Sequence, residues 1–153
     1  KNDPVSHTIA LSLKDYLSKH TYHSDMLLKD EPIINNSFNF LETTITYIKN
    51  TNFKIKHHDK KFHSLYHHNK LTKIKSIHAS SFGPKQQPTN ITLNTLHRIN
   101  TNSSSDILKV HATLEHIYVA RHFGYKNKHF KRALTRMSIT TEDPLWHALI
   151  KYL

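Results

Sequence analysis

The sequence of 153 residues contains no cysteine, which excludes a disulfide framework, a thiolate zinc site and a cysteine nucleophile. Glycine occurs only at Gly83 and Gly124, which argues against hairpin-rich barrels and against a glycine-rich phosphate loop. No apolar run approaches the roughly 20 residues that a membrane-spanning helix needs, and no apolar signal core is present. These absences favour a helical chain that is not an integral membrane protein.

Acidic residues are also few, with 11 Asp and Glu against 22 Lys and Arg. The imbalance is local: residues 1–53 carry a net charge of −1, residues 54–136 carry +13, and residues 137–153 carry −1. A bias of composition alone would spread the lysines evenly along the chain. The concentration of positive charge in the middle therefore predicts an anionic partner.

The cations of this middle segment form two runs, and aromatic residues lie within both. Phosphates are bound by several cations along a surface, and exposed bases stack on aromatic rings. The alternative is that the aromatic side chains are core anchors and that the lysines form a solvated face. The first run comprises Lys54, Lys56, Lys60, Lys61, Lys70, Lys73 and Lys75, with Phe53, Phe62 and Tyr66. The second comprises Arg121, Lys126, Lys128, Lys131, Arg132 and Arg136, with Phe123, Tyr125 and Phe130. We predict that these thirteen cations contact nucleic acid.

Helical spacing dominates the apolar pattern of the N-terminal half. Asp3-Pro4 is typical of a helix start and predicts a helix over residues 4–20. The spacing of Phe38, Leu41, Ile45 and Ile48 predicts a second helix to about residue 50, with Asn39 and Glu42 placed like a capping box. The Lys- and His-rich stretch before residue 79 predicts one long helix or two short ones. Residues 79–90 predict an exposed loop.

The C-terminal half predicts four helices. A short helix contains Leu93, Leu96 and Ile99, although the alternation in residues 91–96 is also compatible with a strand. A longer helix begins after a serine cap near residue 105 and ends at Gly124. Its inward stripe is expected to consist of Ile107, Val110, Leu114, Ile117 and Tyr118. The next helix buries Phe130, Ala133, Leu134 and Met137, and Asp143-Pro144 opens a last one with Leu145, Trp146, Leu149, Ile150 and Leu153 inside.

We therefore expect an all-α fold, a single irregular bundle of about five to seven helices with a basic, partly extended central segment. One domain is expected over residues 1–153, with near-neutral N-terminal helices over 1–53, a basic Lys/His segment and loop over 54–90, and a helical C-terminal part over 91–153. The apolar fraction of 37% predicts a thin core. Trp146, the sole tryptophan, is expected to anchor that core, with a contact to a partner as the alternative.

Fifteen histidines raise the question of a metal site, since His63 and His67 lie four residues apart with His57, His58 and His68 nearby. Cations surround this cluster and Asp59 is its only nearby carboxylate, so we expect no metal and no cofactor. A cluster that faces phosphate would instead bind it more strongly as the pH falls through about 6.5. No paired carboxylates, glycine-elbow serine, HExxH motif or phosphate loop is present, and we do not expect an enzyme or a small-molecule substrate.

A basic middle, helical stripes and a thin core are similar in character to accessory proteins of mitochondrial ribosomes, although no signature motif carries this resemblance. The leading hypothesis is a structural subunit of a ribonucleoprotein, a mitochondrial ribosomal protein, that contacts rRNA and neighbouring proteins. The start at Lys1 without methionine fits a removed presequence and a mitochondrial location. The alternatives are an interaction subunit of a mitochondrial membrane complex and a helical DNA-binding module around Gly124.

Overall fold

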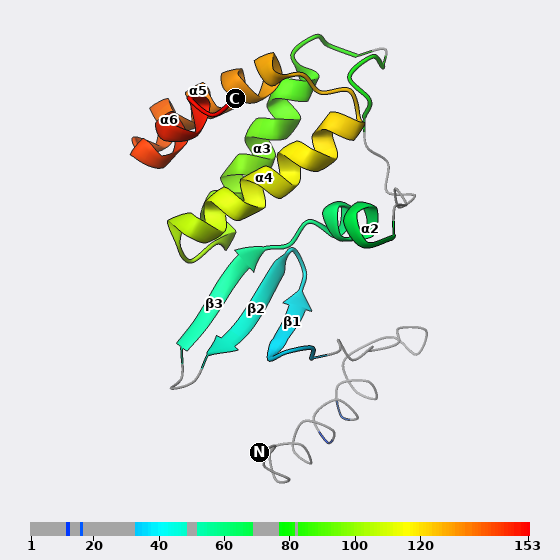
Figure 1. Ribbon diagram of the computed structural model, residues 1–153, viewed down its shortest axis with the longest axis vertical. Coiled ribbons are helices and arrows are strands. Elements are labelled where there is room, and N and C mark those ends of the chain that lie inside the picture. Colours follow the sequence, from blue (N-terminus) through cyan, green and yellow to red (C-terminus); the bar gives the residue numbers. More distant parts are fainter. Residues whose placement is uncertain (1–11, 13–15, 17–32, 49–51, 69–76, 82) are drawn as a thin grey trace. The chain divides into compact units, whose positions relative to one another are not determined.

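The computed structural model describes residues 12, 16, 33–48, 52–68, 77–81 and 83–153. The chain divides into two units, Lys1–Pro32 and Ile33–Leu153. In the first unit Ser12 and Tyr16 are described, and both are helical. The rest of the predicted helix over residues 4–20 lies outside the described residues. In the second unit three strands are followed along the chain by five helices, counting the described residues (Figure 1).

The prediction of an all-α fold is wrong, because the described part of the chain mixes helices with an antiparallel sheet. The strands are β1 (Ser37–Phe40), β2 (Thr43–Ile48) and β3 (Asn52–His57), in the order β1-β2-β3. Ile45 of β2 is opposite Phe38 of β1 and Ile55 of β3. β1 and β2 replace the helix predicted from residue 38, and β3 occupies the start of the segment predicted to be helical.

Local chemistry explains why this region is a sheet. Residues 43–48 are mostly β-branched or aromatic, which favours a strand over a helix although the apolar spacing fits both. Asn35 and Asn36 have φ angles of 51° and 59°, the backbone of a two-residue hairpin turn, and Ile34 and Ser37 pair across it. The expected capping box does not form, since the Asn39 side chain accepts a hydrogen bond from Thr44 Oγ1 at 2.8 Å on the next strand.

The outer edge of β3 is attached to the connection between two helices, α3 (Gln87–Asn102) and α4 (Asp106–His122). Ser104 N donates to Ile55 O at 2.9 Å, and Ile55 N donates to Ser104 Oγ at 3.1 Å. His57 N donates to Ser103 Oγ at 3.3 Å. The polar connection between α3 and α4 therefore satisfies the backbone of an edge strand and fixes the sheet to the helices.

The other helices are α2 (Lys60–His68), α5 (Asn127–Thr141) and α6 (Pro144–Ile150). Two predicted helix boundaries are confirmed: Gly124 has a φ of 77° after α4, and Asp143 Oδ1 accepts from Leu145 N at 2.9 Å at the start of α6. The loop expected over residues 79–90 ends sooner, because Pro88 lies in the first turn of α3, where its missing N–H costs nothing. Residues 91–96 are helical, so the alternative of a strand there is wrong.

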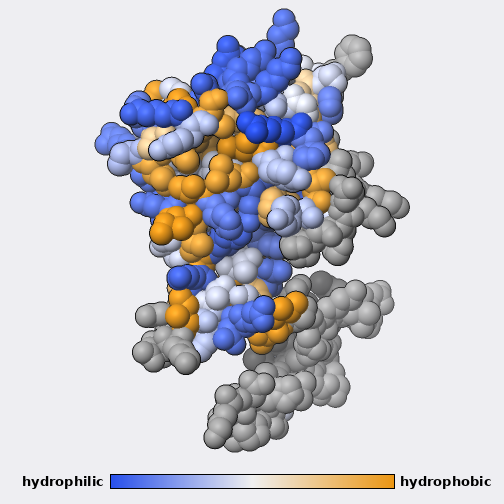
Figure 2. All heavy atoms as spheres, viewed as in Figure 1, coloured by the Kyte–Doolittle hydropathy of each residue, from blue (hydrophilic) through white to orange (hydrophobic). Residues whose placement is uncertain are grey.

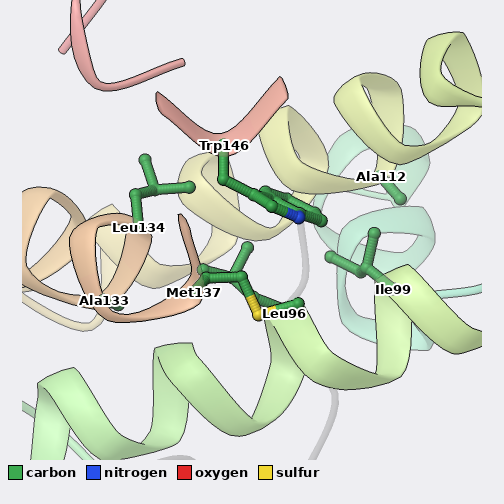
Figure 3. Close-up of a cluster of buried hydrophobic side chains, with 7 residues drawn as sticks. All are labelled: Leu96, Ile99, Ala112, Ala133, Leu134, Met137 and Trp146. Carbon is green, nitrogen blue, oxygen red and sulfur yellow. The ribbon is translucent and has the colours of Figure 1, made fainter. Parts of the chain in front are cut away.

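The main core lies between α3, α4, α5 and α6 (Figure 3). Trp146 is fully buried and points into the group of side chains shown there, which confirms its predicted role as a core anchor. The four residues predicted to be buried in α5 are all buried. The main core consists of Leu96, Ile99, Ala112, Ala133, Leu134, Met137 and Trp146. A smaller cluster contains Ile117, Ala120, Tyr125 and Phe130.

The inward stripe predicted for α4 is wrong at three of its five positions, whereas Ile117 is buried as predicted and Val110 is half-buried. Ile107, Leu114 and Tyr118 are exposed, with Ile107 at 81%, whereas Glu115 and His116 are buried. Small side chains such as Ala112 and Ala120 occupy much of the buried face of α4. The sheet also carries exposed apolar side chains, and Figure 2 shows hydrophobic residues at the surface of this unit. The core is therefore as thin as the composition predicted.

Candidate polyanion-binding surface

The second basic run lies mainly on α5, where charge and burial separate cleanly between two faces. Lys128, Lys131 and Arg132 are exposed, whereas Phe130, Ala133, Leu134 and Met137 are buried. This separation follows from the helical period of the sequence, which places the apolar side chains against the core and the cations in solvent. Hydrophilic residues gather at the top of Figure 2, the part of the view in which α5 lies in Figure 1. The helix thus presents its cations as one continuous surface.

Three of these cations also line a hollow of about 570 Å³ at the start of α5, which we call the basic groove. A fourth cation enters it from the loop before α3, and none of its lining residues is acidic. The groove is lined by His78, Ala79, Ser80, Lys85, Pro88, Gly124, Lys126, Lys128, His129 and Arg132. Four cations facing one concave surface raise the local positive potential more than the same charges on a convex one.

The groove owes its shape to the contact between residues 77–81 and the turn after α4. Ala79 N donates to Phe123 O at 2.8 Å, and Tyr125 Oη donates to Ile77 O at 3.1 Å. At Gly124 a Cβ atom would lie 3.0 Å from the ring of His78, so a residue without a side chain is needed there. The left-handed turn and the absent side chain together let the loop approach the start of α5.

His129 closes the first turn of α5. Its Nδ1 accepts a hydrogen bond from Lys126 N at 3.0 Å, and its own N–H donates to Lys126 O at 2.8 Å. A neutral imidazole that accepts at Nδ1 carries its proton on Nε2. Burial lowers the pKa of His129, and the charges of Lys128, Arg132 and Lys126 lower it further. At neutral pH the groove is therefore charged by lysine and arginine, with His129 available as a neutral donor.

Five of the six Asp and Glu side chains in the described residues are engaged with other cations or with a helix end, and Glu142 is exposed after α5. Glu115 pairs with Lys56 at 2.7 Å, and Glu42 pairs with Arg98 at 2.8 Å. Lys109 pairs with Asp106 at 3.2 Å and with Asp143 at 3.3 Å. Asp59 Oδ1 accepts from the backbone N–H of Lys61 at 2.8 Å at the start of α2. No described carboxylate forms an ion pair with a cation of the basic groove.

The structure brings together only part of the predicted nucleic-acid-binding set. Lys126, Lys128 and Arg132 meet in the basic groove, and Lys131 is exposed on the same helix. Arg121 donates to Asn127 Oδ1 at 3.1 Å, beside the start of α5. Arg136, further along α5, donates to Asn90 Oδ1 at 3.2 Å.

The first basic run is dispersed by comparison. Lys54 on β3 and Lys60 at the start of α2 are exposed, whereas Lys56 is half-buried against Glu115. Lys61 lies 6.0 Å from the centre of the Phe123 ring. Three members fall outside the described residues: Lys70, Lys73 and Lys75.

The aromatic residues of the two runs have both of the roles considered from the sequence. Tyr125 and Phe130 are buried in the core, as expected of anchors. Phe53 on β3 and Tyr66 on α2 are exposed, at 57% and 63%. Both exposed rings also contact other aromatic rings, Phe53 that of Tyr47 and Tyr66 those of Phe62 and Tyr118.

Four polar members of the groove were missed in the sequence, and one of them is His129 on α5. Lys85 lies in the predicted loop, isolated from both basic runs, and His78 and Ser80 precede it. The available signal was that Lys85 is flanked by Pro84 and Pro88, which marks a rigid segment able to hold a lysine against a neighbour. Counting charges along the chain could not show that it meets α5.

The histidine cluster is also resolved in part. His57 is buried, and burial lowers its pKa and so disfavours its charged form. The side chains of His63, His67 and His68 lie outside the described part of the chain. Among the described side chains, no three His, Asp or Glu residues come together as metal ligands.

Comparisons with known proteins supply no relative. No family model, no curated protein and no solved structure matches the chain. In the described part of the chain, no helix is both long enough and apolar enough to cross a membrane.

Proposed function

We propose that this chain is a non-catalytic subunit of a ribonucleoprotein, with the mitochondrial ribosome as the particle, and that it contacts RNA phosphates through α5 and the basic groove. The observation that carries the proposal is the convergence of Lys85, Lys126, Lys128 and Arg132 on one hollow without a carboxylate. Cations that have no carboxylate partner among the described residues are costly to bring together unless they meet an anion.

The dimensions of the site favour a polymer of phosphates over a single small anion. The exposed cations continue from the groove along α5 to Lys131 and Arg136, about two helical turns beyond Lys128. Successive phosphates of a nucleic acid chain need cations spread along a surface, and each contact releases counterions. Arg121 at the end of α4 offers a further cation, and its guanidinium donates to Asn127 at the start of α5.

The test is the salt dependence of binding to single-stranded RNA. The variant carries Lys126→Gln, Lys128→Gln, Lys131→Gln and Arg132→Gln, all at exposed positions, so the helical fold should persist. If all four cations contact phosphates, the slope of log K against log salt falls by about 3. Single substitutions Lys128→Gln and Lys151→Gln form a matched pair, since Lys151 is exposed after α6 and outside the groove.

Unchanged affinity and slope in the quadruple variant would overturn the proposal. Duplex DNA and vesicles of anionic phospholipid are measured beside the RNA at the same salt concentrations. Tighter binding to either of them would assign the basic surface to DNA or to a membrane instead.

A further inference from the structure

The outward face of α4 is apolar, although it lies in solvent. Ile107, Leu114 and Tyr118 are 81%, 52% and 42% exposed, and Val110 between them is half-buried. Residues three or four positions apart lie on the same face of a helix. These four side chains therefore form one continuous apolar surface along α4, which we call the outer stripe.

The inner face of α4 is apolar as well. Ala112, Val119 and Ala120 are all buried on that side of the helix. A helix that is apolar all round is typical of one that is covered on every side. A helix with one face in water carries charged residues on that face, as α5 does. The outer stripe therefore indicates an interface.

Aromatic rings extend the outer stripe onto α2, which packs against α4 (Figure 1). The ring of Tyr66, which is 63% exposed, lies 6.4 Å from that of Tyr118 between centroids. The Phe62 ring lies 5.8 Å from Tyr118, and the His122 ring lies 4.9 Å from it. Aromatic side chains are enriched at protein interfaces and depleted of charge around them. The apolar surface thus spans two helices.

The two ends of the outer stripe carry charges of opposite sign. Asp106 at the start of α4 pairs with Lys109 at 3.2 Å, and its side chain remains 68% exposed. Arg121 and His122 are exposed at the end of the helix. In two antiparallel copies of α4 that meet at Leu114, residues equally distant from Leu114 in opposite directions face each other. Asp106 of each copy then lies beside Arg121 and His122 of the other, so the stripe is complementary to itself.

We infer that α4 forms a symmetric dimer of this chain, in which the outer stripes of two copies pack antiparallel across Leu114. Val110 of each copy then meets Tyr118 of the other, whereas Ile107 lies at the rim, where contacts contribute little. The antiparallel pairing also opposes two helix dipoles favourably. A two-fold axis requires one surface that is complementary to itself. An unrelated partner would not require opposite charges at matched distances from the centre.

The dimer goes beyond the proposed function and is compatible with it. None of the residues that line the basic groove belongs to α4, so the grooves of both copies stay open. Of the cations proposed to contact RNA, only Arg121 lies on α4. Two grooves in one particle would raise the affinity for an RNA long enough to reach both.

Sedimentation equilibrium of the intact protein without RNA tests the inference. The wild type should show a monomer–dimer equilibrium as its concentration is varied. Leu114→Glu places two carboxylates against each other at the centre of the dimer and should raise the dissociation constant at least about a hundredfold. Ile139→Glu is the matched control and should leave the constant unchanged, because Ile139 is 73% exposed on α5, outside the outer stripe. Circular dichroism checks that both variants fold.

A charge exchange tests the antiparallel arrangement. Asp106→Lys and Arg121→Glu should each raise the dissociation constant about tenfold, because each brings like charges together, and the combined variant should regain the wild-type constant. A wild type that stays monomeric at every concentration rules out the inference. So does a dimer that Leu114→Glu leaves intact, or a combined variant that recovers nothing.

Discussion

Lys56 Nζ lies 2.7 Å from Glu115 Oε1, and this ion pair joins β3 to α4. Glu115 is only 8% exposed, on the face of α4 that packs against the rest of the unit. One of the lysines expected to contact RNA thus serves inside the chain, where it compensates a buried carboxylate. The positive charge of the middle segment has two uses, one structural and one available for a partner.

Replacing Lys56 should therefore affect folding more than binding. Lys56→Gln leaves the Glu115 carboxylate buried without a cation and should lower the free energy of unfolding by about 1–3 kcal/mol. Lys54→Gln is the matched control, because Lys54 is exposed two residues earlier on the same strand. It should change stability by less than about 0.5 kcal/mol. Urea denaturation of both variants measures the difference, and equal losses would show that the pair contributes nothing.

Gly124 should be the less replaceable of the two glycines. Gly124→Ala places a side chain at a φ of 77° and against the His78 ring, and should cost about 1–2 kcal/mol. In Gly83→Ala the added methyl group meets the end of the flexible Gln87 side chain, which can move away. Thermal unfolding of the two variants compares them directly. A larger loss at Gly83 would contradict the geometry of the turn.

Trp146 should dominate the stability of the helical core. Trp146→Ala removes a fully buried side chain and should cost about 3–5 kcal/mol. Trp146→Phe should cost clearly less, because the indole Nε1 has no hydrogen-bond partner among the described residues. Ile107→Ala is the control for an exposed apolar residue and should be nearly neutral. An alanine variant at position 146 as stable as the wild type would refute this role.

Stability should fall as the pH drops from 7 to 5, because His116 is held neutral. The ordinary pKa of histidine is 6.5, whereas burial lowers the pKa of His116 in the folded chain to about 4. The unfolded chain therefore takes up a proton that the folded chain does not, and stability is lost as the pH falls below 6.5. The loss is roughly 1 kcal/mol per pH unit for one imidazole.

The charges nearest His116 change the size of this effect and not its sign. Asp59 opposes the lowered pKa, whereas His57 and Lys61 reinforce it. The measurement is the free energy of unfolding by denaturant at pH 7, 6 and 5, for the wild type and for His116→Gln. The variant should lose less stability over this range, and parallel curves would place the titrating group elsewhere.

Helices α5 and α6 could be predicted from the sequence, since burial in α5 follows the helical period closely. Phe130, Ala133, Leu134 and Met137 are buried as predicted, and Asp143-Pro144 opens a helix as predicted. The sheet was missed because Phe38, Leu41, Ile45 and Ile48 have helical spacing and also fit two strands with a turn between them. The Asn35-Asn36 pair and the threonines of residues 43–46 were the signals that favoured strands.

The candidate site could be predicted only in part. Charge counting identified Lys126, Lys128 and Arg132, because they are close together along one helix. It could not identify Lys85, which reaches the groove through a loop, or show that Lys56 is compensated. The prediction of which α4 residues are buried failed because the buried Glu115 pairs with a residue 59 positions away in the sequence. No local sequence pattern shows such a partner.

The central claim is that α5 and the basic groove bind RNA, and cross-linking of the native protein tests it most directly. Cells are irradiated with ultraviolet light, the protein is purified under denaturing conditions, and peptides carrying nucleotides are identified by mass spectrometry. We expect RNA attached to peptides that cover residues 78–85 and 121–136. Recovery of the protein without RNA, or attachment confined to other segments, would contradict the account.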